Sequence, residues 1–201
     1  MTEFKSLEEI NKYFLENIES DLFKTAKNVV PGEGSAEAEI MFVGEAPGAK
    51  EDELGRPFVG PAGKFLDSLL ESIDLGRSSV FITNVVKCRP PNNRDPSIEE
   101  KKIFAPWLKA QIDFINPKVF VPLGRHALGS FLPNVQISSA HGKVFYREKD
   151  GRSVFVMYHP AVALYNGSFR EILINDMQNL KEFLNKERQS KKPEEDQLSI
   201  F

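Results

Sequence analysis

Cysteine is nearly missing from this 201-residue sequence, in which Cys88 is the only one. A single thiol excludes an internal disulfide framework and any metal site built from cysteines alone. The three histidines lack metal-ligand spacing and no Gly-x-Ser-x-Gly motif occurs, so hydrolysis by zinc or by an activated serine is not expected. No apolar run approaches the roughly 20 residues that span a bilayer, and the N-terminus has no signal-peptide profile. The sequence therefore predicts a cytoplasmic protein with no membrane partner and no bound metal.

A strong charge bias is also missing, since the formal net charge is −3. The two signs are unevenly distributed: residues 1–55 hold 13 acidic and 5 basic side chains, whereas residues 56–201 hold 16 and 21. The basic part of the chain also contains most of the predicted loops, and a polyanion bound there is one interpretation. Ordinary solvated charges are the other, and charge alone does not decide between them.

Short apolar runs alternate with helix-forming segments along most of the chain. A capping box at Ser6–Glu9 begins an amphipathic helix, and a second at Ser97–Glu100 begins a helix that extends to about Ile115. Repeated strand and helix units predict an α/β fold, with a mainly parallel sheet and helices on both faces. The predicted strands are 39–43, 80–86, 119–123, 143–147 and 153–158, and the further helices are 64–75, 126–131 and 170–187.

Three predicted loops, 44–63, 87–96 and 159–168, follow strands and are expected at one edge of the sheet. The first is rich in glycine and proline, and we expect no helix or strand within it. Loops of this length inside compact domains are usually functional, and ligands of parallel sheets bind at the carboxyl ends of the strands. The stretch GRPFVGPAGK at 55–64 is not a phosphate loop, because Pro61 follows Gly60, Phe65 follows Lys64 and no hydroxyl residue is placed to hold magnesium.

Five short motifs occur in order along these segments: GEAPG at 44–48, GRPFVG at 55–60, ITNVVKCRPP at 82–91, NRDP at 93–96 and YHPA at 158–161. With them the sequence resembles the uracil-DNA glycosylase superfamily, and most closely its family four, from about Val29 to Leu184. The resemblance implies a three-layer α/β/α sandwich that flips uracil out of DNA and hydrolyses its N-glycosidic bond, leaving an abasic site. The alternative is a protein that keeps this fold and binds damaged DNA or a nucleotide without turnover. Covalent trapping of the product is not expected, because the basic, histidine-containing insertion of such relatives is missing.

The resemblance also implies a role for each residue of the base site. Asn84 reads the base, because one carboxamide can satisfy both the N3 donor and the O4 acceptor of uracil, whereas cytosine reverses that pattern. Phe58 is the platform on which the flipped base stacks, and His159 donates to uracil O2 as negative charge develops. Glu45 either places the attacking water or holds its loop through backbone amides. The other substrate-binding residues are Gly44 and Ala46.

DNA contacts are expected from side chains of the same loops and of the segments near them. In relatives the last loop enters the minor groove, and Leu164 or Tyr165 is the expected wedge that fills the gap left by the flipped nucleotide. No lysine of the motifs is placed to form a Schiff base, so a monofunctional enzyme is expected. The predicted DNA-binding residues are Lys87, Arg89, Arg94, His141, Lys143, Leu164, Tyr165 and Arg170.

Family-four enzymes typically hold a four-iron, four-sulfur cluster through four cysteines, of which only Cys88 is matched here. The other three positions hold Asn17, Ser20 and Phe104, and one thiolate cannot hold such a cluster because each iron needs its own ligand. We expect no cofactor. Phe104 and neighbours such as Trp107 are expected to fill the space, with Cys88 as a small buried apolar side chain.

The C-terminus carries a separate signal. Beyond a domain at 1–187, the charged tail 188–201 is expected to be disordered, yet it ends in apolar residues that have no core to join. Its last five residues resemble the motif that binds the bacterial DNA polymerase sliding clamp, and such a tether would raise the local concentration on DNA. The alternative is a tail that packs back on its own domain. We expect a nucleoid-associated monomer whose clamp-binding residues are Gln197, Leu198, Ile200 and Phe201.

Overall fold

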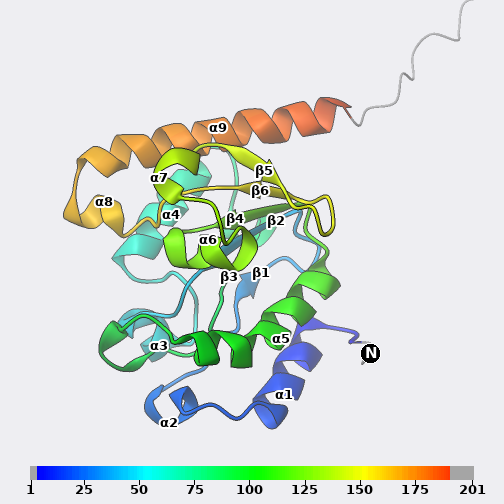
Figure 1. The fold of residues 1–201 in the computed structure, drawn as a ribbon, viewed down its shortest axis with the longest axis vertical. Helices are drawn as coiled ribbons and strands as arrows, with labels where there is room; N and C mark the ends of the chain where they lie inside the picture. The colour runs from blue at the N-terminus through cyan, green and yellow to red at the C-terminus, as the bar shows by residue number, and fades with distance from the viewer. Residues whose placement is uncertain (1–3, 191–201) are drawn as a thin grey trace, which may run out of the picture.

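The computed structural model describes residues 4–190. Their helices and strands are shown in Figure 1 and are, in chain order, α1 (Leu7–Asn17), α2 (Leu22–Thr25), β1 (Glu33–Gly34), β2 (Ile40–Gly44), α3 (Ala49–Leu54), α4 (Pro61–Glu71), η1 (Arg77–Ser79), β3 (Phe81–Asn84), η2 (Pro91–Asn93), α5 (Ile98–Ile115), β4 (Val119–Pro122), α6 (Arg125–Phe131), α7 (Ile137–Ala140), β5 (Val144–Tyr146), β6 (Ser153–Phe155), α8 (Val162–Tyr165) and α9 (Ser168–Ser190). No helix within this range is both long and apolar enough to cross a bilayer.

The strands form one sheet in the order β1-β3-β2-β4-β6-β5. The central four are parallel, and the short strands β1 and β5 add to the two edges in the antiparallel direction. The chain leaves β2 toward β3 on one side and later returns to β4 on the other. The carboxyl ends of β2, β3 and β4 therefore lie together at the point where the strand order reverses, which is the ligand-binding position of open parallel sheets.

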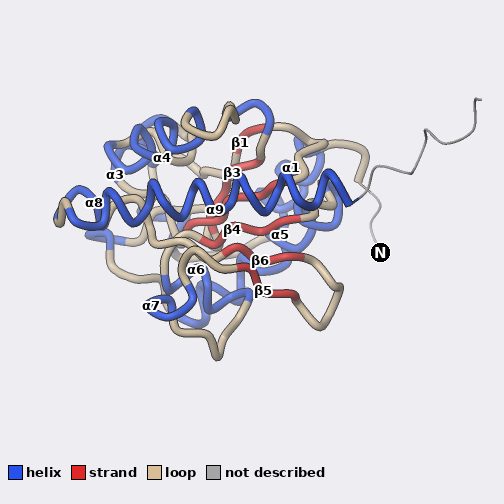
Figure 2. Tube along the Cα trace, turned by 90° about the horizontal axis from the view of Figure 1, so that it is seen from above, coloured by secondary structure: helices blue, strands red, loops and turns tan. Residues whose placement is uncertain are grey.

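Helices cover both faces of the sheet, so the fold is a three-layer α/β/α sandwich. Alternate side chains of β2 divide between the faces: Met41 and Val43 join the cluster packed against α1, α5 and α6, whereas Ile40 and Phe42 join the one packed against α4 and α9. Figure 2 shows α9 running over the sheet. All five predicted strands occur, although β3, β5 and β6 are shorter than predicted. The strands β2, β3, β4 and β6 are buried throughout, whereas the edge strand β5 is not.

Three expectations about the chain path are wrong. The stretch 44–63 contains α3, which lies between Gly48 and a left-handed Gly55, and α4 begins at Pro61, a residue favoured in the first turn of a helix. The predicted strands do not include the short strand β1, which precedes β2 in the chain. Helix α9 continues to Ser190, so the first residues of the predicted tail, 188–190, are helical. Residues 191–201, with the predicted clamp-binding motif, lie outside the described residues.

Candidate active site

Asn84 ends β3 directly beside Gly44, the last residue of β2. The Asn84 side chain is 2% exposed, so its amide faces inward from a rigid strand end. A Cβ atom on Gly44 would lie 2.3 Å from Asn84 Oδ1 and 2.7 Å from Phe58 Cζ. The missing side chain at Gly44 therefore lets the Asn84 amide and the Phe58 ring approach the same point at the end of β2.

Phe58 adopts a left-handed backbone conformation, with φ of 51°, which is unusual for a large side chain. The Arg77 guanidinium donates to the carbonyl oxygens of Pro57 at 2.6 Å and Phe58 at 3.1 Å. Arg77 is itself held by the carboxylates of Glu33 at 2.6 Å and Asp67 at 2.8 Å. This network satisfies the carbonyls of the turn and offsets the strain at Phe58.

A carboxylate holds the following residues of the same turn. Glu51 Oε1 accepts the backbone N–H groups of Val59 at 2.8 Å and Gly60 at 2.7 Å. Gly63 packs so closely beneath the turn that a Cβ atom there would lie 1.7 Å from the carbonyl oxygen of Phe58. Arg77 and Glu51 thus fix the Phe58 turn through its carbonyl and N–H groups, and we call these two residues the Phe58 clasp.

The His159 ring stacks on Phe58, with centroids 5.5 Å apart and 30° between the planes. His159 Nδ1 accepts the backbone N–H of Ala161 at 3.1 Å, so the neutral imidazole carries its proton on Nε2. Burial lowers the pKa of His159 to about 4, against a smaller raising effect of Glu51. At neutral pH the side chain is therefore an uncharged Nε2–H donor.

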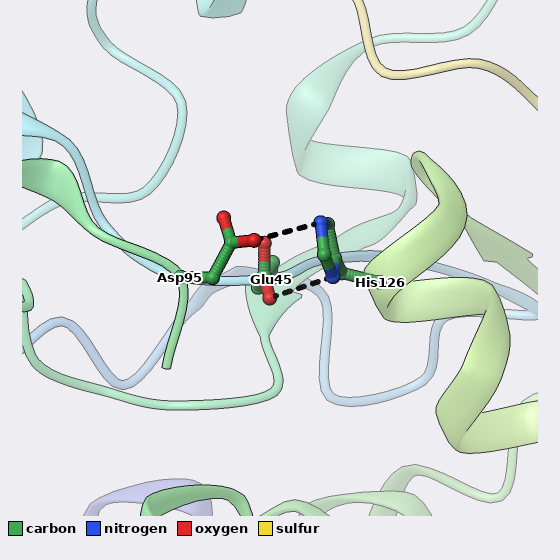
Figure 3. Close-up of side chains that lie close together, drawn as sticks. All are labelled: Glu45, Asp95 and His126. Carbon is green, nitrogen blue, oxygen red and sulfur yellow. Dashed lines mark ion pairs between the residues drawn. The ribbon is translucent and has the colours of Figure 1, made fainter. Parts of the chain in front are cut away.

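Glu45 follows Gly44, and its carboxylate contacts the Lys101 ammonium and the His126 imidazole. Lys101 Nζ lies 2.9 Å and His126 Nδ1 3.4 Å from Glu45 Oε1, and His126 Nε2 lies 3.2 Å from an Asp95 carboxylate oxygen (Figure 3). One ligand atom from each of Glu45, Asp95 and His126 lies within 4.8 Å of the others, a grouping that a divalent cation can bridge. The Lys101 ammonium already supplies positive charge at Glu45, and this arrangement fixes the orientation of the carboxylate.

The comparison with known proteins agrees with this geometry. Residues 31–186 match the family described as Uracil DNA glycosylase superfamily. The chain belongs to that superfamily. It is 48% identical over 186 residues to the Type-4 uracil-DNA glycosylase of Sulfurisphaera tokodaii, a match that covers 88% of this chain and 84% of that protein. The Type-4 uracil-DNA glycosylase of Saccharolobus solfataricus is 47% identical, covering 81% and 79%, and that of Archaeoglobus fulgidus is 45% identical, covering 92% and 96%.

The prediction that Lys87 binds DNA is wrong, because the Lys87 side chain is completely buried. Lys87 Nζ donates to Thr83 Oγ1 at 2.6 Å, the Asn84 carbonyl at 2.8 Å and Gln111 Oε1 at 2.7 Å. Burial lowers the pKa of Lys87 well below its usual value, whereas three acceptors favour the ammonium form. Lys87 therefore supports the backbone of Asn84 from within the protein.

The other basic residues predicted to bind DNA lie nearer the surface. Arg94 is 48% exposed and forms a two-bond ion pair with Glu100, at 2.8 and 2.6 Å, and Arg89 donates to Asn93 Oδ1 at 2.7 Å. Arg170 is exposed, with its guanidinium 4.6 Å from the centre of the Phe65 ring. All three keep a surface that DNA can reach.

His141 follows α7, and the predicted wedge residues Leu164 and Tyr165 lie on α8. His141 Nδ1 is 3.0 Å from a carboxylate oxygen of the buried Asp176, while Lys143 is exposed and donates to a backbone carbonyl. On α8, Leu164 is 49% and Tyr165 89% exposed. Two large apolar side chains exposed on one short helix next to His159 are available for contact with a partner molecule.

The residues around Cys88 do not fit a four-cysteine cluster, because three of the four positions offer no thiol. Phe104 and Trp107 are completely buried and stack with centroids 6.4 Å apart. Phe14 stacks on Trp107 at 5.6 Å, and Phe23 meets Phe104 edge-on at 5.8 Å. Cys88 belongs to the same apolar cluster, and burial raises the pKa of its thiol to about 12.

Sequence reasoning missed Arg77, Glu51, Lys101 and His126. Each acts through a partner that is distant in the sequence or lies on another loop, so no local motif contained both members. One signal was present for Glu51, which lies shortly before the motif that contains Phe58, a bulky residue set between Pro57 and a glycine-rich turn, whereas helix α4 separates Arg77 from that motif. A left-handed turn there requires groups that hold its backbone.

Proposed function

We propose that this chain is a monofunctional uracil-DNA glycosylase, which removes uracil from DNA by hydrolysis and leaves an abasic site. The observation that carries the proposal is the close approach of Asn84, at the end of β3, Phe58, on the turn before α4, and His159, which follows β6. An amide, an aromatic face and a neutral N–H donor match the three demands of the reaction: recognition, stacking and stabilisation of the leaving group. The Type-4 uracil-DNA glycosylases similar to this chain support the same substrate.

Base recognition rests on Asn84 and Phe58. The carboxamide of Asn84 accepts from uracil N3–H and donates to O4, and cytosine leaves both groups unpaired. By analogy with base-edge readout, mispairing of the amide costs about 1–3 kcal/mol. Stacking on Phe58 adds about 1–3 kcal/mol and does not discriminate between bases. Gly44 and Ala46 line the same site and keep the approach to the amide open.

Bond cleavage moves the electron pair of the N1–C1′ bond onto uracil, while the sugar becomes cationic. His159 Nε2–H donates to uracil O2, where negative charge develops. A preorganised donor of this kind contributes about 3 kcal/mol in the transition state. Since the imidazole is neutral, it stabilises the departing anion by hydrogen bonding and transfers no proton to it.

Water attack at C1′ completes the hydrolysis: the water oxygen bonds to C1′, and the proton that it releases passes by way of Glu45 to solvent, from which the departed uracil anion takes up a proton. Both ion pairs of Glu45 use Oε1, so Oε2 is the oxygen available to orient a water. The reaction is largely dissociative and needs little base strength, which suits a carboxylate held by Lys101 and His126. Lyase chemistry is not part of the proposal, because the Lys87 amine makes three internal hydrogen bonds and Lys101 pairs with Glu45.

DNA is held by the exposed side chains around this edge. Leu164 and Tyr165 enter the minor groove as the wedge, and the cationic residues contact phosphates. His141 acts with them through the part of its ring that faces away from Asp176. The phosphate-contacting residues are Arg89, Arg94, His141, Lys143 and Arg170.

An excision assay tests the proposal. The chain is incubated with a labelled uracil-containing oligonucleotide and then with alkali, which cleaves abasic sites. We expect cleavage that depends on uracil and falls at least about 100-fold for Asn84→Ala and His159→Ala. Binding to the uracil oligonucleotide without cleavage would replace the proposal by the binding-protein alternative. Equal cleavage by all three proteins would refute the assigned roles.

The enzyme works without an iron–sulfur cluster in this proposal. The supporting observation is the aromatic packing of Phe104, Trp107, Phe14 and Phe23 beside a single buried thiol. Purified protein is expected to be colourless and to hold far less than one iron per chain by elemental analysis. Visible absorbance with stoichiometric iron would contradict it.

The tail is proposed to tether the enzyme to a bacterial-type sliding clamp, as a monomer associated with the nucleoid. The support is the sequence of Gln197, Leu198, Ile200 and Phe201, at the end of a charged segment. Clamp binding by the full chain is measured against a chain ending at Asp196. Loss of binding in the shorter chain is expected, and unchanged binding would remove the tether.

A further inference from the structure

A second surface feature lies between α5, α6 and the turn that joins β5 to β6, elements that Figure 1 labels. It is a groove of about 850 Å³ with an apolar floor. Ile98, at its rim, is 68% exposed, although it is a large aliphatic residue. We call this groove the α5–α6 groove. The apolar residues that line its floor and rim are Val85, Ile98, Ala105, Pro106, Leu108, Ile112 and Phe131.

The walls of this groove are strongly cationic. Two carboxylates, Asp113 and Asp150, accompany six basic side chains. Asp113 pairs with Lys109, and Asp150 lies 3.4 Å from Arg147 and 3.7 Å from Arg152, so these acids neutralise only part of the charge. The basic residues of the walls are Lys101, Lys102, Lys109, Arg147, Lys149 and Arg152.

Two of these cations are held rigidly against aromatic rings. The Arg147 guanidinium lies 5.0 Å from the Phe120 ring centre and 5.7 Å from that of Phe131, and Arg152 lies 5.8 Å from Phe120. Arg152 Nη2 donates to Asn116, but its Nη1 is buried and has no hydrogen-bond partner among residues 4–190. An unpaired guanidinium nitrogen is costly to bury, and an anion would pair with it once the Arg152 side chain turns toward the groove.

We infer that the α5–α6 groove binds an acidic peptide segment of a partner protein, one that carries aliphatic or aromatic side chains beside its carboxylates. The carboxylates pair with Arg152, Lys149 and Lys102, and the apolar side chains cover the floor. Charge complementarity and an apolar floor together select this chemistry. A nucleic acid brings phosphates but no aliphatic groups for the floor.

The groove has one end near the base site, where Val85 follows Asn84 and Lys101 pairs with Glu45, and its other end at the turn 147–152. Strand β6 runs parallel to β4, so the turn at 147–152 that precedes it lies at the amino edge of the sheet, opposite the edge that holds Asn84. A peptide bound there can recruit the enzyme without covering the base site. Mutations of Lys102, Lys149 and Arg152 are therefore expected to leave excision of a free oligonucleotide unchanged.

The test uses a fluorescein-labelled peptide, Glu-Asp-Glu-Leu-Ile-Phe, and fluorescence anisotropy with the full chain. We expect a Kd of roughly 10–100 μM at low salt that weakens as salt rises. Arg152→Gln and Lys102→Glu are each expected to weaken binding about tenfold. Lys12→Glu, an equally exposed change on α1 outside the groove, is expected to have no effect. Uracil excision and melting temperature of each variant show that the fold is kept.

Five results would overturn the inference. They are absence of binding up to about 1 mM peptide, equal binding of the neutral peptide Gln-Asn-Gln-Leu-Ile-Phe, and insensitivity to both groove substitutions. The fourth is complete displacement by a duplex without uracil, which would assign the surface to DNA. Binding that appears only after removal of residues 191–201 would instead assign the groove to the tail of this chain and would equally contradict a partner.

Discussion

The Phe58 ring rests directly on the His159 ring, with the centroids 5.5 Å apart. A base inserted between two rings would need the ring planes about 7 Å apart, twice the usual contact distance of carbon atoms. Uracil therefore does not enter between these two side chains. In the proposed complex, uracil stacks on the part of the Phe58 face that His159 leaves uncovered, with the Nε2 edge of His159 toward O2.

The neutral state of His159 predicts the pH dependence of excision. Because burial lowers its pKa to about 4, the rate of a single turnover should show no ionisation of His159 near its usual pKa of 6.5. The rate should fall only as the pH approaches 4, since protonation of Nδ1 would break the hydrogen bond from Ala161. A rate that drops by half near pH 6.5 and loses this step in His159→Gln would contradict the assignment.

The same pKa has a consequence for stability. An unfolded histidine takes up its proton below about pH 6.5, before the folded protein does, so His159 lowers the free energy of unfolding as the pH falls from 6.5 toward 4. Urea unfolding of the wild type and of His159→Gln should therefore diverge less at pH 5 than at pH 7, with His159→Gln losing less stability on acidification. Parallel pH dependence of the two proteins would argue against a buried neutral imidazole.

The Phe58 clasp predicts different effects for two arginines that both pair with Glu33. Arg77 also donates to the carbonyls of Pro57 and Phe58, whereas Arg56 is largely exposed and contacts only the carboxylate. Arg77→Met should lower kcat/KM for uracil excision about 10- to 100-fold by displacing Phe58, and Arg56→Met should change it less than about twofold. Similar losses in both variants would show that Glu33, and not the turn, is what matters.

Burial of Lys87 predicts a structural role in place of a DNA contact. Lys87→Met removes donors from Thr83, Asn84 and Gln111, which should lower the free energy of unfolding by about 3 kcal/mol or more in urea titrations. The salt dependence of DNA binding should not change. Arg89→Gln is the comparison, because loss of one phosphate contact reduces the slope of log K against log salt by about one. A reduced slope in Lys87→Met would restore the original prediction.

The wedge residues predict a dependence on the form of the DNA. Leu164→Ala and Tyr165→Ala should slow excision from double strands about tenfold, because the gap left by the flipped nucleotide is no longer filled. Excision from single strands, which have no partner strand to close the gap, should be nearly unaffected. Equal loss on both substrates would place these side chains in the base site itself.

The strands β2, β3 and β4 could be predicted because each is a short, largely apolar run that ends at glycine, asparagine or proline. The order of the strands in the sheet was not predicted. The candidate base-site residues Asn84, Phe58 and His159 could be named because each lies in a short motif. What the sequence could not show were contacts that join distant segments: the bonds from Arg77 to the Phe58 turn, and the grouping of Glu45, Asp95 and His126. Lys87 was misassigned for a related reason, since its position in a basic, loop-like motif resembles a phosphate contact while its acceptors lie on β3 and α5.

A crystal structure of the chain soaked with uracil tests the central claim most directly. We expect the uracil ring to lie against Phe58, with the Asn84 amide at about 2.7–3.2 Å from both N3 and O4 and His159 Nε2 at a similar distance from O2. Uracil bound elsewhere, or bound against Phe58 with Asn84 and His159 out of hydrogen-bond reach, would contradict it.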